Sequence, residues 1–308
     1  MKVAVWGAGE IGTGLVYRLT SSPHVSEVLW INKTFDKIRL RVVDIQQGLA
    51  FAPTCRTVEG FPQARARRAL RQCDLLVLTL GSKVPPGGKR VDTLKQNADL
   101  LTSTVIPELS EFEGIVLVVT NPVDAMTWLV HARAGIEARR CIGLGTVVET
   151  ARLRASLARH LQPVRAARNV FAYAVGTHDE LFVPVTSGAA SRGNAGFNEE
   201  VVEMARKETA NGAARVKDDH KSSLHPVVEG ILAIVEAVAT DRRDILTVST
   251  RDPVDGLFYS MPCTVGRAGI DHRHAELLED ENVHNAIQKC KDELFKQRQA
   301  VEEARSDQ

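Results

Sequence analysis

The first half of the chain alternates short apolar runs with longer segments in which apolar residues recur every three or four positions. Such runs predict strands, and the longer period predicts amphipathic helices. The runs at 75–80 and 114–120 are continuously apolar, which is typical of strands buried on both faces of a sheet. In chain order the pattern predicts a strand at 2–6, a helix at 11–20, a strand at 27–31, a helix at 35–49, a strand at 75–80, a helix at 91–109 and a strand at 114–120. This alternation predicts right-handed crossovers and a mostly parallel sheet.

The rhythm changes after about Gly145. Beyond it the pattern predicts helices at 149–161, 197–211, 227–241 and 279–304, strands at 170–175 and 180–186, and a β-hairpin formed by 244–251 and 256–265. We therefore expect a doubly wound α/β domain at 1–145 and an α+β domain at 146–308. The boundary rests on the change of rhythm alone, because no linker rich in proline, glycine or serine separates the halves.

The segment Gly7-Ala8-Gly9-Glu10-Ile11-Gly12 follows the first predicted strand and opens the first predicted helix. Gly7 would permit a tight turn, Gly9 would let a pyrophosphate approach the backbone, and Gly12 would let helix and strand pack closely. The N–H groups at the helix start, around Glu10 and Ile11, favour a bound anion. A plain glycine turn is the alternative. The strand, the motif, the helix and the second strand together favour a Rossmann-type dinucleotide-binding domain.

The end of the second predicted strand bears on the choice between NAD and NADP as cofactor. An acidic residue that binds the ribose hydroxyls is expected there, but the chain has Asn32 followed by Lys33. Without a carboxylate a 2′-phosphate is not repelled, and Lys33 could bind it, which slightly favours NADP. The alternative is that Asn32 hydrogen-bonds the ribose of NAD and that Lys33 is a solvated surface residue.

Six further segments, in order along nearly the whole chain, make the sequence resemble the lactate/malate dehydrogenase family. They are VVDIQQGLAF at 42–51, GSKVPPGGKRVD at 81–92 with the helix that carries Asn97, VTNPVDAMT at 119–127, GLGTVVETARLR at 143–154, GTHDELFVPV at 176–185 and PCTVGRAGI at 262–270. The resemblance implies hydride transfer between NAD(P)H and a 2-oxo or 2-hydroxy acid of L configuration. It also implies a homo-oligomer, either a dimer or a tetramer.

The resemblance assigns roles to three residues of the second half. His178 matches the histidine that transfers the proton, and an imidazole gains and loses protons readily near neutral pH. Arg152 matches the arginine that binds the substrate carboxylate, which a planar guanidinium can hold through two parallel bonds. Glu149 stands where the family has an aspartate that orients the histidine; it keeps the charge but adds one methylene. Glu149 and Arg152 share a helix face, so a surface ion pair is the alternative.

In the first half the resemblance points to the loop at 81–90 and to the end of a buried strand. Arg90 matches the arginine of a mobile loop that closes over the substrate, where it would meet the developing alkoxide. Asn121 would hydrogen-bond the substrate and the nicotinamide region. Val119 and Asn97 match positions that contact the cofactor.

The position that selects the substrate departs from the family pattern. Malate enzymes of the family place an arginine in the loop, and lactate enzymes commonly place a glutamine. Here the aligned residue is Val84, preceded by Lys83, and valine cannot pair with a second carboxylate. Asp179 and Glu180 also replace the Gly-Asp that follows the family's histidine. These departures favour a non-standard 2-oxo acid with an apolar or cationic tail, and Ser223, near the matching pocket wall, does not decide it. Malate or lactate dehydrogenase proper is the alternative.

Composition excludes several other classes. The 308 residues carry 39 Lys and Arg against 38 Asp and Glu, so there is no surplus charge for nucleic acid or an anionic membrane. We expect no membrane span and no secretory leader, because the apolar runs are short. The five cysteines are widely spaced and form no C-x-x-C, so we expect no disulfide framework, no metal site and a cytoplasmic protein.

Two other interpretations of the sequence compete with that of a 2-hydroxy acid dehydrogenase. A short-chain reductase requires Tyr-x-x-x-Lys, but Tyr17, Tyr173 and Tyr259 are followed four residues later by Ser, Thr and Cys. A non-catalytic dinucleotide sensor remains the alternative of another class, although a sensor has no use for a proton donor and two arginines.

Overall fold

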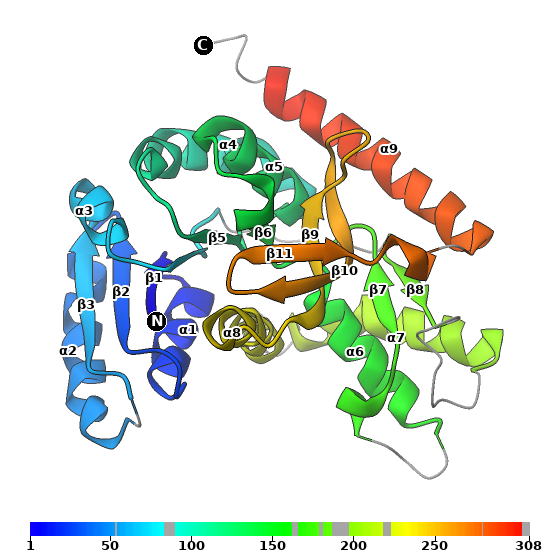
Figure 1. Ribbon diagram of the computed structural model, residues 1–308, viewed down its shortest axis with the longest axis horizontal. Coiled ribbons are helices and arrows are strands. Elements are labelled where there is room, and N and C mark those ends of the chain that lie inside the picture. Colours follow the sequence, from blue (N-terminus) through cyan, green and yellow to red (C-terminus); the bar gives the residue numbers. More distant parts are fainter. Residues whose placement is uncertain are drawn as a thin grey trace.

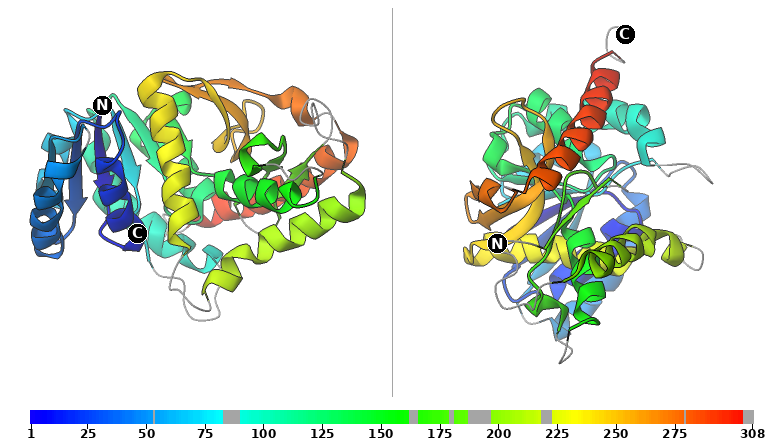
Figure 2. Two further views of the ribbon diagram at one scale, coloured as in Figure 1. Left: turned by 90° about the horizontal axis from the view of Figure 1, so that it is seen from below. Right: turned by 90° about the vertical axis from the view of Figure 1, so that its right-hand side faces the viewer.

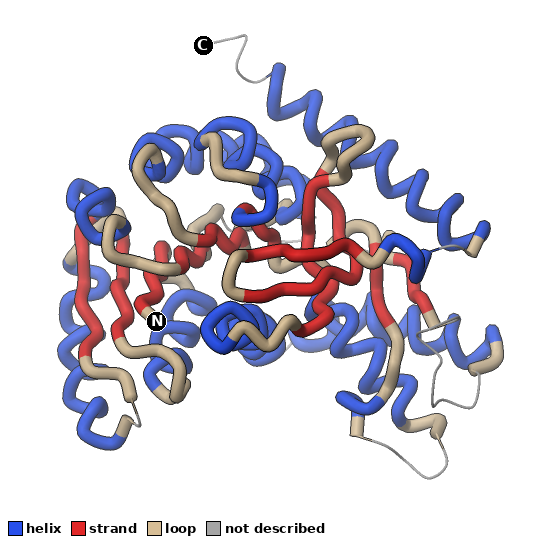
Figure 3. The backbone as a smooth tube through the Cα atoms, in the orientation of Figure 1, coloured by secondary structure: helices blue, strands red, loops and turns tan. Residues whose placement is uncertain are grey.

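A computed structural model describes residues 1–52, 54–82, 90–161, 166–178, 181–186, 197–217, 223–278 and 280–303. One sheet crosses the molecule from side to side, with helices above and below it (Figures 1 and 3). In the described part of the chain it has nine strands in the order β11-β10-β9-β6-β5-β4-β1-β2-β3.

The amino-terminal half supplies the parallel part of the sheet. Its strands are β1 (Lys2–Trp6), β2 (Glu27–Asn32), β3 (Thr57–Pro62), β4 (Leu75–Leu78), β5 (Ile115–Val118) and β6 (Cys141–Gly143). They lie in the order β3-β2-β1-β4-β5-β6 and pair in parallel, which confirms the predicted doubly wound α/β fold. The sequence pattern misses β3, which is interrupted by Glu59 and Gly60, and β6, which is only three residues long.

The two faces of β1 are buried by different helices, as the alternation of a strand requires. Val3 and Val5 face a core formed with α1 (Glu10–Thr20) and α2 (Asp36–Gly48). Ala4 and Trp6 face a second core formed with α3 (Ala66–Leu70), α4 (Leu94–Leu100) and α5 (Val123–Ala134).

The helix predicted at 91–109 is less regular than expected. After α4 the backbone continues as a π-helical turn, Leu101–Val105, and a 3-10 turn, Ile106–Leu109. Pro107 lies in this last turn and has no N–H to donate, which accounts for the loss of regular helix there. The sequence pattern does not predict α5.

The carboxyl-terminal half extends the same sheet with antiparallel strands. These are β9 (Asp244–Arg251), β10 (Phe258–Gly266) and β11 (Gly269–Arg273), and β9 joins β6 through the Gly143–Ser249 pair. A separate hairpin, β7 (Tyr173–Val175) with β8 (Val183–Val185), is tied to β10 by a bridge between Gly176 and Ser260. The later helices are α6 (Val147–Ala158), α7 (Glu199–Lys217), α8 (Leu224–Thr240) and α9 (Glu281–Glu303).

Two of these helices hold the halves together. Helix α8 packs beside α1, where Gly14 permits the contact: a Cβ there would lie 2.9 Å from Leu224 Cδ1 (Figure 2). Helix α9 crosses the β9–β10 pair and reaches α5 (Figure 1). Within the described ranges, no helix combines the length and apolarity that a membrane crossing requires.

A charged network fastens α9 to the turn between β9 and β10. Lys291 Nζ lies 2.8 Å from carboxylate oxygens of both Asp252 and Asp255, and the Tyr259 hydroxyl donates to Asp252 over 2.7 Å. Burial opposes the charge on Asp252, but hydrogen bonds from Lys291, the Val254 N–H and Tyr259 outweigh it and lower the Asp252 pKa to about 2.

This network predicts an acid-sensitive contribution to stability. Lys291→Met should lower the free energy of unfolding by about 1.5–3 kcal/mol near neutral pH, because Asp252 stays buried after losing its closest cation and is left with the more distant Arg273 Nη2, at 3.8 Å. The folded-state pKa of Asp252 is depressed, so its contribution is complete above about pH 4 and is lost as the pH falls toward the folded value. Urea titrations at several pH values should therefore show the difference between wild type and variant shrinking below about pH 4.

Lys296→Met is the matched control, because the exposed Lys296 lies on the same helix and pairs only loosely, at 3.7 Å, with Glu293. A difference for Lys291→Met that is independent of pH, or no larger than the control's, would contradict this prediction.

Candidate active site

The glycine turn lies between the carboxyl ends of β1 and β4, where the direction of strand order reverses. Gly7 has φ +131°, and a Cβ there would lie 2.6 Å from Thr79 Oγ1, so only glycine fits. A Cβ on Gly12 would meet the carbonyl of Gly7, whereas Gly9 has no atom within 4 Å of its Cβ position. Helix α1 begins at Glu10, followed by Ile11. Gly7 and Gly12 thus leave no room for a side chain, whereas Gly9 faces open space. This arrangement would let a pyrophosphate approach the backbone at the start of α1.

A buried tryptophan that the sequence analysis did not single out supports this turn. Trp30, on β2, donates its indole N–H to the carbonyl of Gly7 over 2.7 Å, and Gly7 donates its own N–H to the carbonyl of Ile31 over 2.9 Å. The sequence does offer a sign of this contact: a tryptophan within the apolar run of a buried strand needs a hydrogen-bond acceptor for its indole N–H.

The end of β2 places polar groups beside the turn. The side chain of Asn32 donates to the carbonyl of Thr34 over 2.9 Å, and Lys33 is exposed. Arg41, on α2, was not predicted; its guanidinium donates to Thr13 Oγ1, near the start of α1, over 3.0 Å. The segment that follows β2 thus carries several cations, among them Lys33 and Arg41.

Three residues of the second half come together around one buried carboxylate. Glu149, in the first turn of α6, has its Oε2 2.9 Å from His178 Nδ1 and its Oε1 3.7 Å from Arg152 Nη1. The side chains are 5%, 10% and 17% exposed for Glu149, His178 and Arg152. Although glutamate is one methylene longer than aspartate, Glu149 still makes a hydrogen bond of normal length to His178. The Glu149–Arg152 ion pair is largely buried, so it is not an ordinary surface ion pair.

Two further residues hold this group in place. The backbone N–H of His178 donates to Asp124 Oδ2 over 3.2 Å, which links the histidine to the first turn of α5. Arg152 donates to Ser223 Oγ over 2.8 Å, and a Cβ on Gly212 would lie 3.2 Å from Arg152 Cδ. Asp124 lies in the segment at 119–127 that resembles the family, but the sequence alone assigns it no role.

Asn121 lies at the carboxyl end of β5, three residues before Asp124. Its side-chain Oδ1 is buried and has no hydrogen-bond partner in the described part of the protein. An orphaned acceptor beside the strand end fits a ligand with a donor there, such as a nicotinamide amide. Val119, two residues earlier, is half-buried and donates its N–H to the carbonyl of Leu78.

Asn97, on α4, is buried and fully engaged with the protein. Its Nδ2 donates to the Asn121 carbonyl over 2.7 Å and to Thr93 Oγ1 over 3.1 Å, and its Oδ1 accepts the Ser82 N–H over 2.6 Å. It therefore joins the start of the loop at 81–90 to Asn121.

The loop residues Lys83 and Val84, together with Asp179 and Glu180, lie outside the described residues. Arg90 begins a 3-10 turn, Arg90–Thr93, and its side chain also lies outside them. A hollow of about 700 Å³ between the ends of α5 and α9 and the β9–β10 turn contains none of the predicted residues.

Known proteins match the chain over nearly its whole length. Residues 1–143 match the model of the lactate/malate dehydrogenase NAD-binding domain, and residues 146–305 match that of the lactate/malate dehydrogenase alpha/beta C-terminal domain. L-lactate dehydrogenase from Salinibacter ruber is 32% identical over 91% of each chain. L-lactate dehydrogenase B from Hordeum vulgare is 29% identical over 87% of this chain and 82% of its own.

Solved structures share the fold. A lactate dehydrogenase from a Medee basin deep-sea metagenome library superposes with a TM-score of 0.87 at 24% identity, covering 98% of each chain. The malate dehydrogenase of Picrophilus torridus gives 0.87 at 23% identity, covering 99% of this chain and 98% of its own. The chain therefore belongs to the lactate/malate dehydrogenase family, and it is an NAD(P)-dependent 2-hydroxy acid dehydrogenase.

Proposed function

We propose that this enzyme interconverts a non-standard 2-oxo acid and its L-2-hydroxy acid, with His178 as the proton donor and acceptor. The observation that carries the proposal is the contact of one buried carboxylate, Glu149, with both His178 and Arg152. A bound nicotinamide would supply or accept the hydride. The groups that handle the proton and the substrate carboxylate are then neighbours.

Each residue has a distinct task in this proposal. The bond to Glu149 puts a proton on His178 Nδ1, so that Nε2 can donate to the carbonyl oxygen during reduction and take the proton back during oxidation. Arg152 binds the substrate carboxylate, and Asn121 hydrogen-bonds the substrate and the nicotinamide region. By the resemblance to the family, Arg90 would serve the developing alkoxide, and Val84 would be the position that meets the variable tail of the substrate and offers it no charge.

The glycine turn, Gly7 to Gly12, would hold the pyrophosphate, with Asn32 and Lys33 at the ribose. We favour NADP slightly over NAD, because this strand end carries no carboxylate and Lys33 is exposed beside it. Val119 would line the nicotinamide side. Asn97 would act through the backbone of Asn121 that it holds.

We also expect a homodimer or homotetramer that acts in the cytoplasm, with a cofactor domain at 1–145 and a substrate domain at 146–308. All five cysteines are free and buried, which agrees with a reducing compartment.

The first test is an absorbance assay of NADH and NADPH oxidation with a panel of 2-oxo acids bearing apolar, cationic, acidic and phosphonate tails. We expect turnover, fastest with an apolar or cationic tail because Val84 cannot pair with a second carboxylate. His178→Asn should abolish turnover and leave the Kd for cofactor unchanged, whereas His160→Asn, at an exposed histidine, should change neither. Tight cofactor binding without oxidation by any member of the panel would support a sensor instead.

The role of Glu149 is tested by a pair of variants. Glu149→Gln keeps the size but removes the charge that stabilises the imidazolium, so we expect kcat to fall by about 10–100-fold, the equivalent of one charge-assisted hydrogen bond. Glu149→Asp keeps the charge and should retain more activity than Glu149→Gln. Equal activities of the two variants would show that the charge is not what matters.

The cofactor preference is tested at Lys33. Lys33→Met should weaken NADPH binding about tenfold, because one charge-assisted contact to the 2′-phosphate is lost, and should leave NADH binding unchanged. Lys37→Met, at an exposed lysine four residues further along, is the matched control. Fluorescence titration measures both Kd values. An unchanged ratio of NADPH to NADH affinity would remove Lys33 from the cofactor site.

A further inference from the structure

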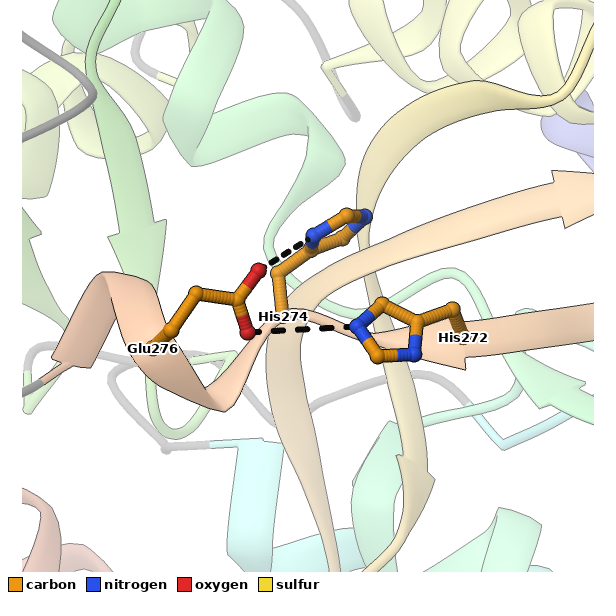
Figure 4. A group of neighbouring side chains, drawn as sticks. All are labelled: His272, His274 and Glu276. Carbon is orange, nitrogen blue, oxygen red and sulfur yellow. Dashed lines mark hydrogen bonds and ion pairs between the residues drawn. The ribbon is translucent and has the colours of Figure 1, made fainter.

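Two histidines and a glutamate converge at the end of β11, outside the candidate active site (Figure 4). His272 and His274 are two residues apart at the strand end, and Glu276 lies in the 3-10 turn Ala275–Leu278 that follows. One nitrogen of each histidine and a carboxylate oxygen all lie within 4.8 Å of one another.

The local backbone explains this convergence. Side chains two residues apart along extended chain point to the same side, so His272 and His274 share a face. The turn then brings Glu276 back toward both rings: its Oε1 lies 2.8 Å from His274 Nδ1, and its Oε2 lies 3.9 Å from His272 Nε2. The carboxylate thus faces both rings at once.

We propose that His272, His274 and Glu276 bind a divalent transition-metal ion of the zinc type. Two imidazole nitrogens and one carboxylate are a ligand set that zinc accepts, with water completing the coordination. Tetrahedral zinc holds its ligand atoms about 3.3 Å apart, so the widest separation among the three donor atoms needs to close by about 1.5 Å. The His272 and Glu276 side chains are 61% and 53% exposed, so both can move to do so.

A fourth residue supports a ligand role for His274. Its Nε2 lies 2.8 Å from Thr264 Oγ1, on the neighbouring strand β10, while its Nδ1 faces Glu276. A metal-bound histidine usually has its other ring nitrogen hydrogen-bonded to an oxygen, which fixes the ring orientation. Thr264 fills that position here, and the His274 side chain is only 18% exposed.

The spacing of the cysteines predicted no metal site, and none of these three residues is a cysteine. The available signal was the run His272-Arg273-His274-Ala275-Glu276, which spans the end of β11 and the start of the following turn. A bound ion would join the end of β11 to the turn that leads toward α9. The proposal is independent of hydride transfer, since none of its residues belongs to the candidate active site.

Calorimetric titration of the metal-free full-length protein with Zn²⁺ tests the proposal, with Co²⁺ absorption as a second readout of nitrogen coordination. We expect wild type to bind one Zn²⁺ ion. The Kd for this ion should rise more than about a hundredfold in His272→Ala and in Glu276→Gln, because each variant removes a ligand. Thr264→Val should weaken binding about tenfold, as loss of a hydrogen bond to a ligand does. His24→Ala removes an exposed histidine elsewhere and should bind as wild type does.

Zn²⁺ should also raise the Tm of wild type and His24→Ala but not that of His272→Ala. His272 and Glu276 are exposed, so their replacement leaves the core intact, and unchanged far-UV circular dichroism checks this. Absence of Zn²⁺ binding by wild type would overturn the proposal. So would equal affinity in wild type, His272→Ala and Glu276→Gln, which would place the ion at other groups.

Discussion

The contact on which the proposed chemistry depends is that of the Glu149 carboxylate with a histidine and an arginine. A carboxylate with 5% of its side chain exposed has lost most of its hydration, and only nearby cations and hydrogen bonds can offset that cost. Arg152 supplies a permanent charge, and His178 supplies a proton that it can also give up. The group that organises the site is therefore itself stabilised by the residues that it organises.

The fold could be predicted from the sequence where its elements are long or continuously apolar. The strand at 75–80 and the helix at 11–20 reappear as β4 and α1 with ends shifted by no more than two residues. The sequence pattern failed where a neighbour rather than the segment itself decides the conformation. β6 has three residues and exists because β5 and β9 flank it, and α5 is buried along most of its length, so it shows little amphipathic period.

The candidate site likewise contains some residues that the sequence predicts and others that it does not. His178, Glu149 and Arg152 could be singled out from the sequence because they lie in segments that resemble the family, and the structure brings them together. The residues that support them were not found, because hydrogen bonds between distant parts of the chain leave no local pattern. Asp124 holds the histidine backbone from 54 residues away, and Ser223 holds Arg152 from 71 residues away. Trp30 supports the glycine turn in the same non-local manner.

Charge balance connects substrate binding to protonation in the proposed mechanism. The Glu149 carboxylate faces both Arg152 and His178. A bound 2-oxo acid brings its own carboxylate, which competes with Glu149 for the guanidinium of Arg152. An imidazolium at His178 compensates Glu149 for that loss, because it pairs with Glu149 while Arg152 pairs with the substrate. The imidazolium is also the form that donates a proton during reduction. Donation of that proton completes the hydroxy acid and leaves His178 neutral, the form ready to accept a proton in the reverse reaction.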